Sequence, residues 1–507
     1  MRLADYLDKG ASLGPERACL TTDGQTRSYA EVRELSSRIS AALAARGVRP
    51  GDRVAVLSAN DPTAFTCVFG ISRAGAVWCP INPRNEAAEN RELLALFGCT
   101  TLIFQSRFAP LVARIRGQLS ELTTLVCLDG VVDDTLTWDD FLALGSSDVD
   151  RPALDDLAMI VGTGGTTGRP KGVELTGTNL ETMTAITLMS YPFPGRPVYL
   201  ALAPLTHAAG VLCFPVLAAG GEVVVMPSPD VGAFLALIEQ HRVTHTFLPP
   251  TLIYMVLAHP ALDRTDLSSL QCFWYGAAPM SATRLEESLR RIGPVMAQLF
   301  GQTEAPMMIS TLAPRDHFHS DGTVAVERLA SAGRPAPLVT VSIMDVEGTL
   351  LAKGDIGEIV IRSSLVMRGY HDDPDATAVA SAHGWHHTGD IGYLDDDNFL
   401  FIVDRAKDMV ITGGFNVYST EVEQTIMQHP AVQDCAVIGL PDEKWGERLT
   451  AVLQLREGTT LDASEMTAFI KQRIGSVKTP KQIEVWPDLP RSKVGKILKG
   501  ELKARLT

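Results

Sequence analysis

Strand-like apolar runs alternate with helical patterns along most of the chain, and this alternation restricts the possible folds more than any other feature. The run "DRVAVLS" precedes "PTAFTCVFGISRAG", and similar runs recur at "TLIF", "EVVVMP", "THTFLPP" and "CFWYGAAP". Near the start, a short strand pair is expected about Asp23 and Gly24. Ser28 and Glu31 then match a capping box, and apolar residues at helical spacing predict a helix that ends near Arg46. The pattern predicts a layered α/β domain with largely parallel sheets.

The pattern changes near Gly333. The runs "VTVSIMD", "IGEIVIRS" and "FLFIVD", separated by Gly/Asp turns, predict a small β-barrel-like subdomain. After "VDRAKDM" the pattern predicts a helix at 420–428, strands at 434–438 and 449–455, and a helix at 464–474. The predicted fold class is therefore α/β, with a large N-terminal domain at 1–404, whose β-sheets are flanked by helices, and a small α+β C-terminal domain at 405–507.

Composition excludes several classes of protein. The net charge of -14 argues against a general nucleic-acid binder, because phosphate backbones repel an acidic surface. The start of the chain has no apolar signal core, and no apolar run is long enough to span a membrane. The longest apolar run, at 208–219, carries Pro215 and predicts a buried helix. The eight cysteines form no C-x-x-C pair and lie in apolar surroundings, which favours reduced core residues and a cytoplasmic protein.

One Gly-rich segment, "VGTGGTTGRPKGVEL" at 161–175, has the residue types of a phosphate-binding loop. Glycines let backbone N–H groups approach an anion, and hydroxyls and a lysine add donors and charge. It is not a P-loop, because Pro170 separates the glycines from Lys171, and Gly172 stands where a magnesium-binding Ser or Thr is required. Pro170 and Gly172 also oppose a helix. The alternative is a polar turn between strands.

Six further segments follow in order: "PLTHAAG", "YGAAPMS", "FGQTEAP", "WHHTGDIG", "DRAKDMVITGGFNVYSTEVE" and "LPRSKVGKILKGEL". Together with the first loop, they resemble the acyl-activating, adenylate-forming superfamily. The resemblance covers essentially the whole chain, and its nearest type is the AMP-forming acyl-CoA synthetase, as in bacterial fatty-acid, aromatic-acid or alicyclic-acid CoA ligases. It implies two steps. A carboxylate attacks the α-phosphate of ATP to give acyl-AMP and pyrophosphate, and the thiol of coenzyme A then displaces AMP after the C-terminal domain rotates.

The resemblance implies where ATP binds. Thr303 contacts the α-phosphate, and Glu304 is the Mg²⁺ ligand, a role that suits a hard carboxylate oxygen. Asp390 takes the ribose hydroxyls and Arg405 assists it. The loop lacks the usual Ser at position 164, which predicts a weaker grip on pyrophosphate. The phosphate loop comprises Thr163, Gly164, Gly165, Thr166, Thr167, Gly168 and Lys171. The adenine is lined by Gly276, Ala277, Ala278, Pro279 and Phe300, and Gly301 and Gln302 also belong to the nucleotide site.

Each of these segments has a structural alternative. Thr303 and Glu304 match a helix cap, Asp390 matches a turn aspartate, and "YGAAP" matches an ordinary exit from a strand. A metal site built on the histidines at 383, 386 and 387 is disfavoured, because their spacing suits neither a helical pair nor a zinc site.

For the C-terminal segments, the resemblance implies roles in the domain that rotates between the two steps. Lys496 resembles the lysine that bridges the carboxylate and the α-phosphate, where a cation lowers the repulsion between two anions. Lys407 matches the hinge, and Gly413 and Gly414 match a narrow tunnel for coenzyme A. The basic residues that fit a solvated tail better are Lys493, Lys499, Lys503 and Arg505.

The acid is expected to be bulky and apolar: fatty, aryl or alicyclic. His207 matches a position that lines and gates the acid channel, although a lone histidine is more often structural. Small residues at 208 to 210 are expected to leave room, and two methionines form an adaptable wall. The predicted acyl pocket comprises Ala208, Ala209, Gly210, Tyr275, Met307 and Met308.

The sequence therefore predicts an acid–thiol ligase that uses ATP, Mg²⁺ and coenzyme A, binds no nucleic acid and has no transmembrane segment. A homodimer is an open alternative to a monomer. The main alternative activity is adenylation for a carrier protein, by a fatty-acyl-AMP ligase or a free-standing adenylation domain. "AAGVLCFPV" lacks the Asp with which such a domain holds a substrate amine. A luciferase-type oxygenase and a non-enzymatic regulator fit less well, because the chain lacks a peroxisomal ending and retains Lys496, Glu304 and Asp390.

Overall fold

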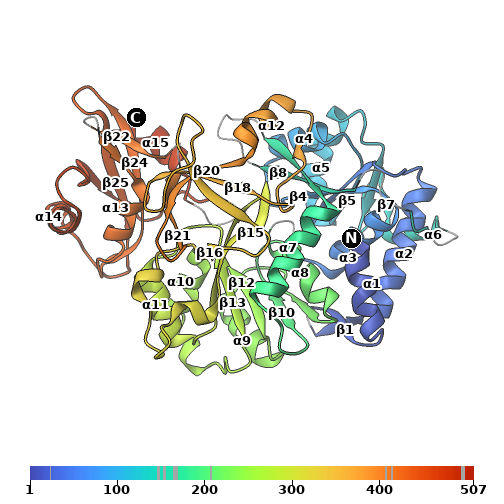
Figure 1. The fold of residues 1–507 in the computed structure, drawn as a ribbon. Coiled ribbons are helices and arrows are strands. Elements are labelled where there is room, and N and C mark those ends of the chain that lie inside the picture. Colours follow the sequence, from blue (N-terminus) through green and yellow to red (C-terminus); the bar gives the residue numbers. More distant parts are fainter. Residues whose placement is uncertain are drawn as a thin grey trace.

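The computed structural model describes the chain except for residues 23, 146–148, 152–155, 164–169, 206–207, 406–407, 413–414 and 493–496, and except for the side chains at 208, 209 and 416. Two large, mostly parallel sheets form the centre of the molecule (Figure 1). The nine-stranded sheet has the order β16 (Arg334–Pro335), β15 (Ala305–Leu312), β14 (Met296–Gln302), β13 (Cys272–Gly276), β12 (His245–Leu248), β10 (Val198–Ala201), β11 (Glu222–Val225), β1 (Ala18–Thr22), β2 (Gln25–Ser28). The eight-stranded sheet has the order β19 (Gly369–Tyr370), β9 (Lys171–Thr176), β8 (Leu157–Thr163), β4 (Val77–Ile81), β3 (Arg53–Leu57), β5 (Cys99–Phe104), β6 (Thr124–Cys127), β7 (Leu136–Thr137).

Helices cover both sheets in layers. The helices that share one core with both sheets are α1 (Leu3–Leu13), α2 (Tyr29–Ala45), α3 (Pro62–Arg73), α6 (Trp138–Ala143), α7 (Gly177–Ser190) and α8 (Ala208–Ala218). The outer face of the nine-stranded sheet carries α9 (Val231–Gln240), α10 (Pro250–Ala258) and α11 (Ala282–Arg291). The outer face of the eight-stranded sheet carries α4 (Ala87–Leu96) and α5 (Ala109–Ile115). This is the layered α/β domain that the sequence predicts.

Alternate residues of single strands enter different cores, as the two-residue period of a strand requires. In β13, Trp274 packs in the core between the sheets, whereas Phe273 and Tyr275 pack beneath α9, α10 and α11. In β3, Val54 and Ala55 divide in the same way. Because both faces of each sheet are buried, these strands read as continuous apolar runs in the sequence.

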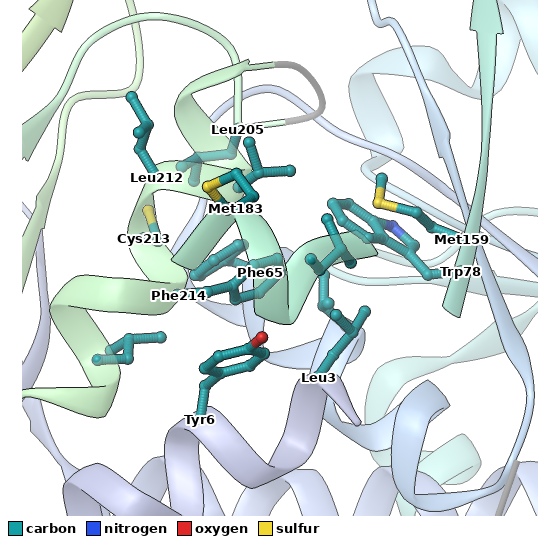
Figure 2. Packing of buried hydrophobic residues seen from close by; sticks show 14 of the residues in the cluster. Leu3, Tyr6, Phe65, Trp78, Met159, Met183, Leu205, Leu212, Cys213 and Phe214 are labelled. Atoms are coloured by element: carbon teal, nitrogen blue, oxygen red, sulfur yellow. The ribbon is translucent and has the colours of Figure 1, made fainter. Parts of the chain in front are cut away.

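The core between the sheets is closely packed (Figure 2). Tyr6 of α1 stacks on Phe214 of α8, with ring centroids 5.1 Å apart, and Figure 2 shows Phe65 of α3 beside them. The apolar run that contains Pro215 is the buried helix α8, as predicted. The capping box at Ser28 and the short strand pair β1–β2 are also confirmed.

A third sheet has the linear order β17 (Thr340–Met344), β18 (Gly357–Arg362), β20 (His386–Leu394), β21 (Leu400–Arg405). The β-rich subdomain predicted after Gly333 is therefore present, but its described strands form an open antiparallel sheet rather than a closed barrel. Four strands are too few to enclose a packed interior. Helix α12 (Pro374–Ala380) contacts β19 and β20.

The C-terminal part forms a separate lobe, shown in orange and red at the left of Figure 1. Its strands are β22 (Val410–Thr412), β23 (Phe415–Val417), β24 (Val432–Asp442), β25 (Gly446–Leu455) and β26 (Gln482–Val485). Its helices are α13 (Ser419–Ile426), α14 (Ala463–Ile474) and α15 (Lys499–Leu506). In the described part of the chain, short 3-10 turns lie at Ser106–Phe108, Arg116–Gln118, Leu262–Arg264, Pro314–His317, Val326–Arg328 and Ala382–Gly384. The predicted helices and strands are present, with β24 and β25 longer than expected.

All eight cysteines are buried and free, as predicted for reduced core residues. In the part of the chain that the structure describes, no helix is both long and apolar enough to cross a membrane.

Candidate active site

The predicted phosphate loop joins two antiparallel strands. β8 ends at Thr163 and β9 begins at Lys171, and these two residues are paired opposite each other. A P-loop leads from a strand into a helix, so the strand that follows this loop confirms that it has another design. The loop residues that lie outside the described part are Gly164, Gly165, Thr166, Thr167 and Gly168.

Lys171 and Glu304 meet at Tyr370, although they belong to different sheets. Glu304 stands in the turn between β14 and β15, whereas Lys171 and Tyr370 begin and end strands at the far edge of the eight-stranded sheet. The Tyr370 hydroxyl donates a hydrogen bond of 2.9 Å to Glu304 Oε1, and Lys171 Nζ lies 4.5 Å from the centre of the Tyr370 ring. Burial and the charge of Glu304 raise the pKa of Tyr370. Its hydroxyl is therefore protonated at neutral pH and acts as a donor.

Tyr370 was not identified from the sequence. It lies in "MRGYHDDP", where a Gly-Tyr pair between turn residues gives only a weak signal. Its neighbour His371 was also missed, and His371 Nδ1 lies 2.7 Å from Glu174 Oε1. Both contacts join segments that are far apart in the chain, and no local pattern records them.

The two segments predicted to line the adenine leave neighbouring strands at the same edge of the nine-stranded sheet. β13 and β14 are parallel, with Gly276 opposite Leu299, so the segments after Gly276 and after Leu299 lie close together. Carboxyl ends of parallel strands are a common place for ligand sites. The structure thus brings together two predicted sets, Ala277, Ala278 and Pro279 from one strand and Phe300, Gly301, Gln302 and Thr303 from the next.

The backbone at this edge has two unusual residues. Ala277 and Met307 have positive φ angles of 67° and 64°. A side chain on Gly301 would come within 2.4 Å of the Met307 nitrogen, so only glycine allows this close approach. Left-handed residues other than glycine cost free energy, and they cluster at binding sites.

Asp390 and Arg405 form an ion pair, with Arg405 Nε 3.1 Å from Asp390 Oδ1. They are paired residues on β20 and β21. The Asp390 side chain is 6% exposed and that of Arg405 is 48% exposed, so the carboxylate is held inside while the guanidinium reaches solvent. The predicted proximity of these two residues is present in the structure.

The histidines near Asp390 have structural partners. His386 Nε2 lies 2.9 Å from Gln302 Nε2, a contact that joins β20 to the end of β14, and His387 Nδ1 lies 2.8 Å from Glu358 Oε2. Burial lowers the pKa of His386 to about 4, so this ring is neutral at neutral pH. Among the described residues, no group of three or more His, Cys, Asp or Glu side chains could hold a metal ion.

The single carboxylate of Glu304 fits a metal site in which the nucleotide phosphates supply most of the ligands. One of its oxygens accepts the Tyr370 bond, and Oε2 receives no hydrogen bond from a described residue. Mg²⁺ is often bound by one or two carboxylates together with substrate phosphates rather than by a full protein cage. A single carboxylate beside the end of the phosphate loop matches that arrangement.

The predicted acyl pocket divides between two cores. Met307 and Met308 pack in the core between the sheets, but Tyr275 packs in the core beneath α9, α10 and α11. There the Tyr275 hydroxyl lies 3.0 Å from His317 Nε2. Because alternate residues of β13 face opposite ways, the structure separates Tyr275 from the two methionines.

Gly210 is closely approached by backbone on one side, and its place in the acyl pocket stays a prediction. A Cβ at this position would lie 1.8 Å from the Leu205 carbonyl oxygen, so this side is already filled by backbone. Gly210 allows α8 to begin directly against the preceding turn. His207 lies outside the described residues, and at Ala208 and Ala209 only the helical backbone is described.

Lys499 is not part of a solvated tail, and this expectation was wrong. Its ammonium lies 2.8 Å from Glu423 Oε1 and 2.5 Å from Ser419 Oγ, with 19% of the side chain exposed. Glu423 also accepts a bond from Val437 N, and the Ser419 N–H donates to Asp404. The predicted residues Lys407, Gly413, Gly414, Lys493 and Lys496 lie outside the described part.

Comparison with known proteins agrees with this arrangement. The family model described as "AMP-binding enzyme" matches residues 7–371, and the model described as "AMP-binding enzyme C-terminal domain" matches residues 421–496. A medium/long-chain-fatty-acid–CoA ligase of Mycobacterium tuberculosis is 37% identical over 93% of this chain and 85% of its own length. A feruloyl-CoA synthase of an Amycolatopsis species is 37% identical over 99% of both chains. The solved structure of an amide bond synthetase from Marinactinospora thermotolerans superposes with a TM-score of 0.91 at 30% identity, over all of both chains.

Proposed function

The chain belongs to the AMP-binding enzyme family, and on that premise we propose that it is an AMP-forming carboxylate–CoA ligase. In the first step, a carboxylate oxygen attacks the α-phosphate of ATP, and pyrophosphate leaves. In the second, the thiol of coenzyme A attacks the acyl carbonyl, and AMP leaves.

The observation that carries this proposal is the meeting of Lys171 and Glu304 at Tyr370. A cation at the end of a Gly/Thr-rich loop suits the outer phosphates of ATP. A carboxylate beside it suits the cation that accompanies them: Glu304 would hold Mg²⁺, which would supply positive charge against the phosphates. Thr303, next to Glu304, would then donate a hydrogen bond to the α-phosphate.

The nucleoside end of ATP has its own group of residues. Asp390 would accept hydrogen bonds from the ribose hydroxyls, with Arg405 beside it. The exits of β13 and β14 would lie along the adenine, where small residues allow close approach of the backbone. The Gln302–His386 contact ties the adenine side to the ribose side.

The second step is assigned to the C-terminal segment. We divide the chain into a domain at 1–404 and a mobile domain at 405–507, with Lys407 as hinge. Lys496 would offset the repulsion between carboxylate and α-phosphate in the first step. Gly413 and Gly414 would leave a narrow path for the pantetheine thiol after rotation. His207 would gate the acid channel.

The proposed substrate is a bulky apolar monocarboxylic acid. Met307 and Met308, which supply a flexible apolar wall, support this class. The two 37%-identical relatives carry a fatty acid and an aryl acid in their names, which favours the same range.

The experiment is a panel of fatty, aryl, alicyclic and amino acids incubated with Mg·ATP, with pyrophosphate release measured with and without coenzyme A. Products are identified by mass. The proposal requires an acyl-CoA from an apolar acid. Release of pyrophosphate without any acyl-CoA would overturn the ligase assignment, and a carrier protein and simple amines are then tested as acceptors.

A further inference from the structure

The segment before α12 holds Glu304 at two points. The Met367 N–H donates to the Glu304 carbonyl oxygen at 2.7 Å, and the Tyr370 hydroxyl donates to the Glu304 carboxylate. The backbone and the side chain of one residue are therefore both fixed by a stretch of four residues. A turn residue between two strands would otherwise have several accessible rotamers.

The same segment is fixed to the strand that begins at Lys171. β19 pairs antiparallel with β9, with Gly369 opposite Glu174 and Tyr370 opposite Val173. The Tyr370 N–H also donates to Thr377 Oγ1 at 2.9 Å, which fastens the strand to α12. The tyrosine is thus supported independently of Glu304 and of Lys171, as a positioning residue must be.

The two contacts of Tyr370 use different parts of its side chain. The hydroxyl binds Glu304 Oε1, which leaves Oε2 for a cation, and the ring face receives the Lys171 ammonium. Carboxylates that bind metals are commonly oriented by a second hydrogen bond, and loss of that partner typically weakens metal binding about 10-fold or more. The negative face of an aromatic ring attracts an ammonium group electrostatically.

We propose that Tyr370 is a positioning residue, which holds the Glu304 carboxylate and the Lys171 ammonium at the spacing required by a magnesium–triphosphate group. The inference rests on the proposed function, because it assumes that Glu304 and Lys171 meet the nucleotide. It predicts separable effects for the hydroxyl and for the ring.

Tyr370→Phe removes the hydroxyl and keeps the ring, so it tests the carboxylate contact alone. Mn²⁺ replaces Mg²⁺ as a paramagnetic probe, and its binding is followed by electron paramagnetic resonance with a non-hydrolysable ATP analogue. Tyr370→Phe is expected to weaken Mn²⁺ binding in the ternary complex about 10-fold. Tyr370→Leu removes the ring as well, and it is expected to weaken binding of the analogue further.

A double-mutant cycle decides whether the effect passes through Glu304. In the Glu304→Gln background, Tyr370→Phe is expected to cause no further loss of Mn²⁺ affinity. Tyr393→Phe is the matched control, because Tyr393 lies on β20, where its ring stacks on Phe401 of β21, and this variant is expected to bind Mn²⁺ as the parent does.

The outcomes separate the two proposals. If the parent protein binds the analogue with Mn²⁺ and Tyr370→Phe binds Mn²⁺ equally well, the positioning role is wrong while the ligase assignment stands. If Tyr370→Phe weakens Mn²⁺ binding by the same factor in the Glu304→Gln background as in the parent, the positioning role is also wrong, because the effect does not pass through the Glu304 carboxylate. If the parent protein binds no nucleotide with the metal, the proposed function itself fails.

Discussion

Asp390 and Arg405 face each other on paired strands, and only the aspartate is buried. Arg405 is two residues before the predicted hinge at Lys407. The contact therefore joins a fixed carboxylate to a side chain at the edge of the proposed mobile domain, which makes the pair sensitive to the position of that domain.

Asp390→Asn is expected to raise the KM for ATP about 10-fold or more, because an amide is a weaker acceptor for two ribose hydroxyls than a carboxylate. The substitution leaves the Asp390 backbone pairing in place. ATP–pyrophosphate exchange at varied ATP measures the effect. Asp396→Asn, in the exposed turn of the same hairpin, is the control. An unchanged KM in Asp390→Asn would remove the ribose assignment.

Lys496→Ala is expected to abolish acyl-AMP formation while leaving thioester formation from supplied acyl-AMP largely intact. In the proposed mechanism, this lysine would act where two anions meet and would leave the site when the domain rotates. The two half-reactions are assayed separately, with Lys503→Ala as control. If both half-reactions fail in Lys496→Ala, the proposed division of roles is incorrect.

Lys499→Met is expected to lower the free energy of unfolding by about 1–3 kcal/mol, because it leaves the partly buried Glu423 carboxylate without its cation. Burial raises the pKa of Glu423. Burial acts to lower the pKa of Lys499, but the negative charges of Glu423 and Asp404 outweigh it, so the pKa of Lys499 is raised. Urea unfolding gives the change. Lys503→Met, on the same helix, should change stability by less than about 0.5 kcal/mol. Adding Glu423→Leu to Lys499→Met should restore much of the loss, and its failure to do so would argue against a charge effect.

Stability is expected to fall as the pH drops from 6.5 towards 4. Burial lowers the pKa of His245, His317 and His386 to about 4, so the unfolded chain binds protons at these sites first. Each neutral ring makes its full contribution to the free energy of unfolding above about pH 6.5. Below that pH the contribution falls by about 1.4 kcal/mol for each pH unit, so about 2 kcal/mol per histidine is lost by pH 5.

Urea unfolding at pH 8 and pH 5 measures this loss, and His245→Asn tests one site. The asparagine side chain can still form a hydrogen bond with Thr244 Oγ1, as His245 Nδ1 does in the parent. Between pH 8 and pH 5, the free energy of unfolding of the variant should fall by about 2 kcal/mol less than that of the parent. An identical loss in both proteins would show that His245 does not contribute.

Much of the fold could be predicted because its signals are local. Strand runs such as "CFWYGAAP", the capping box at Ser28 and the proline-containing helix α8 each lie within a few neighbouring residues. The β-rich subdomain after Gly333 was also predicted, but its open edges were not, because alternation within strands does not reveal how many strands pair or whether the edges join.

The site could be predicted only in its separate segments. Nothing local connects Tyr370 to Glu304 or to Lys171, since strand pairing between β19 and β9 brings them together. Lys499 was misjudged for the same reason. Its basic surroundings read as a solvated tail, whereas its partner Glu423 lies on another helix.

The central claim is that the carboxylate attacks the α-phosphate of ATP. It is tested most directly with an acid, chosen from the panel, whose carboxylate oxygens are both ¹⁸O. The enzyme is incubated with Mg·ATP and coenzyme A, and the nucleotide is analysed by mass. The account predicts AMP that carries one ¹⁸O atom, together with acyl-CoA and unlabelled pyrophosphate. ADP with labelled phosphate, or AMP without label, would contradict it.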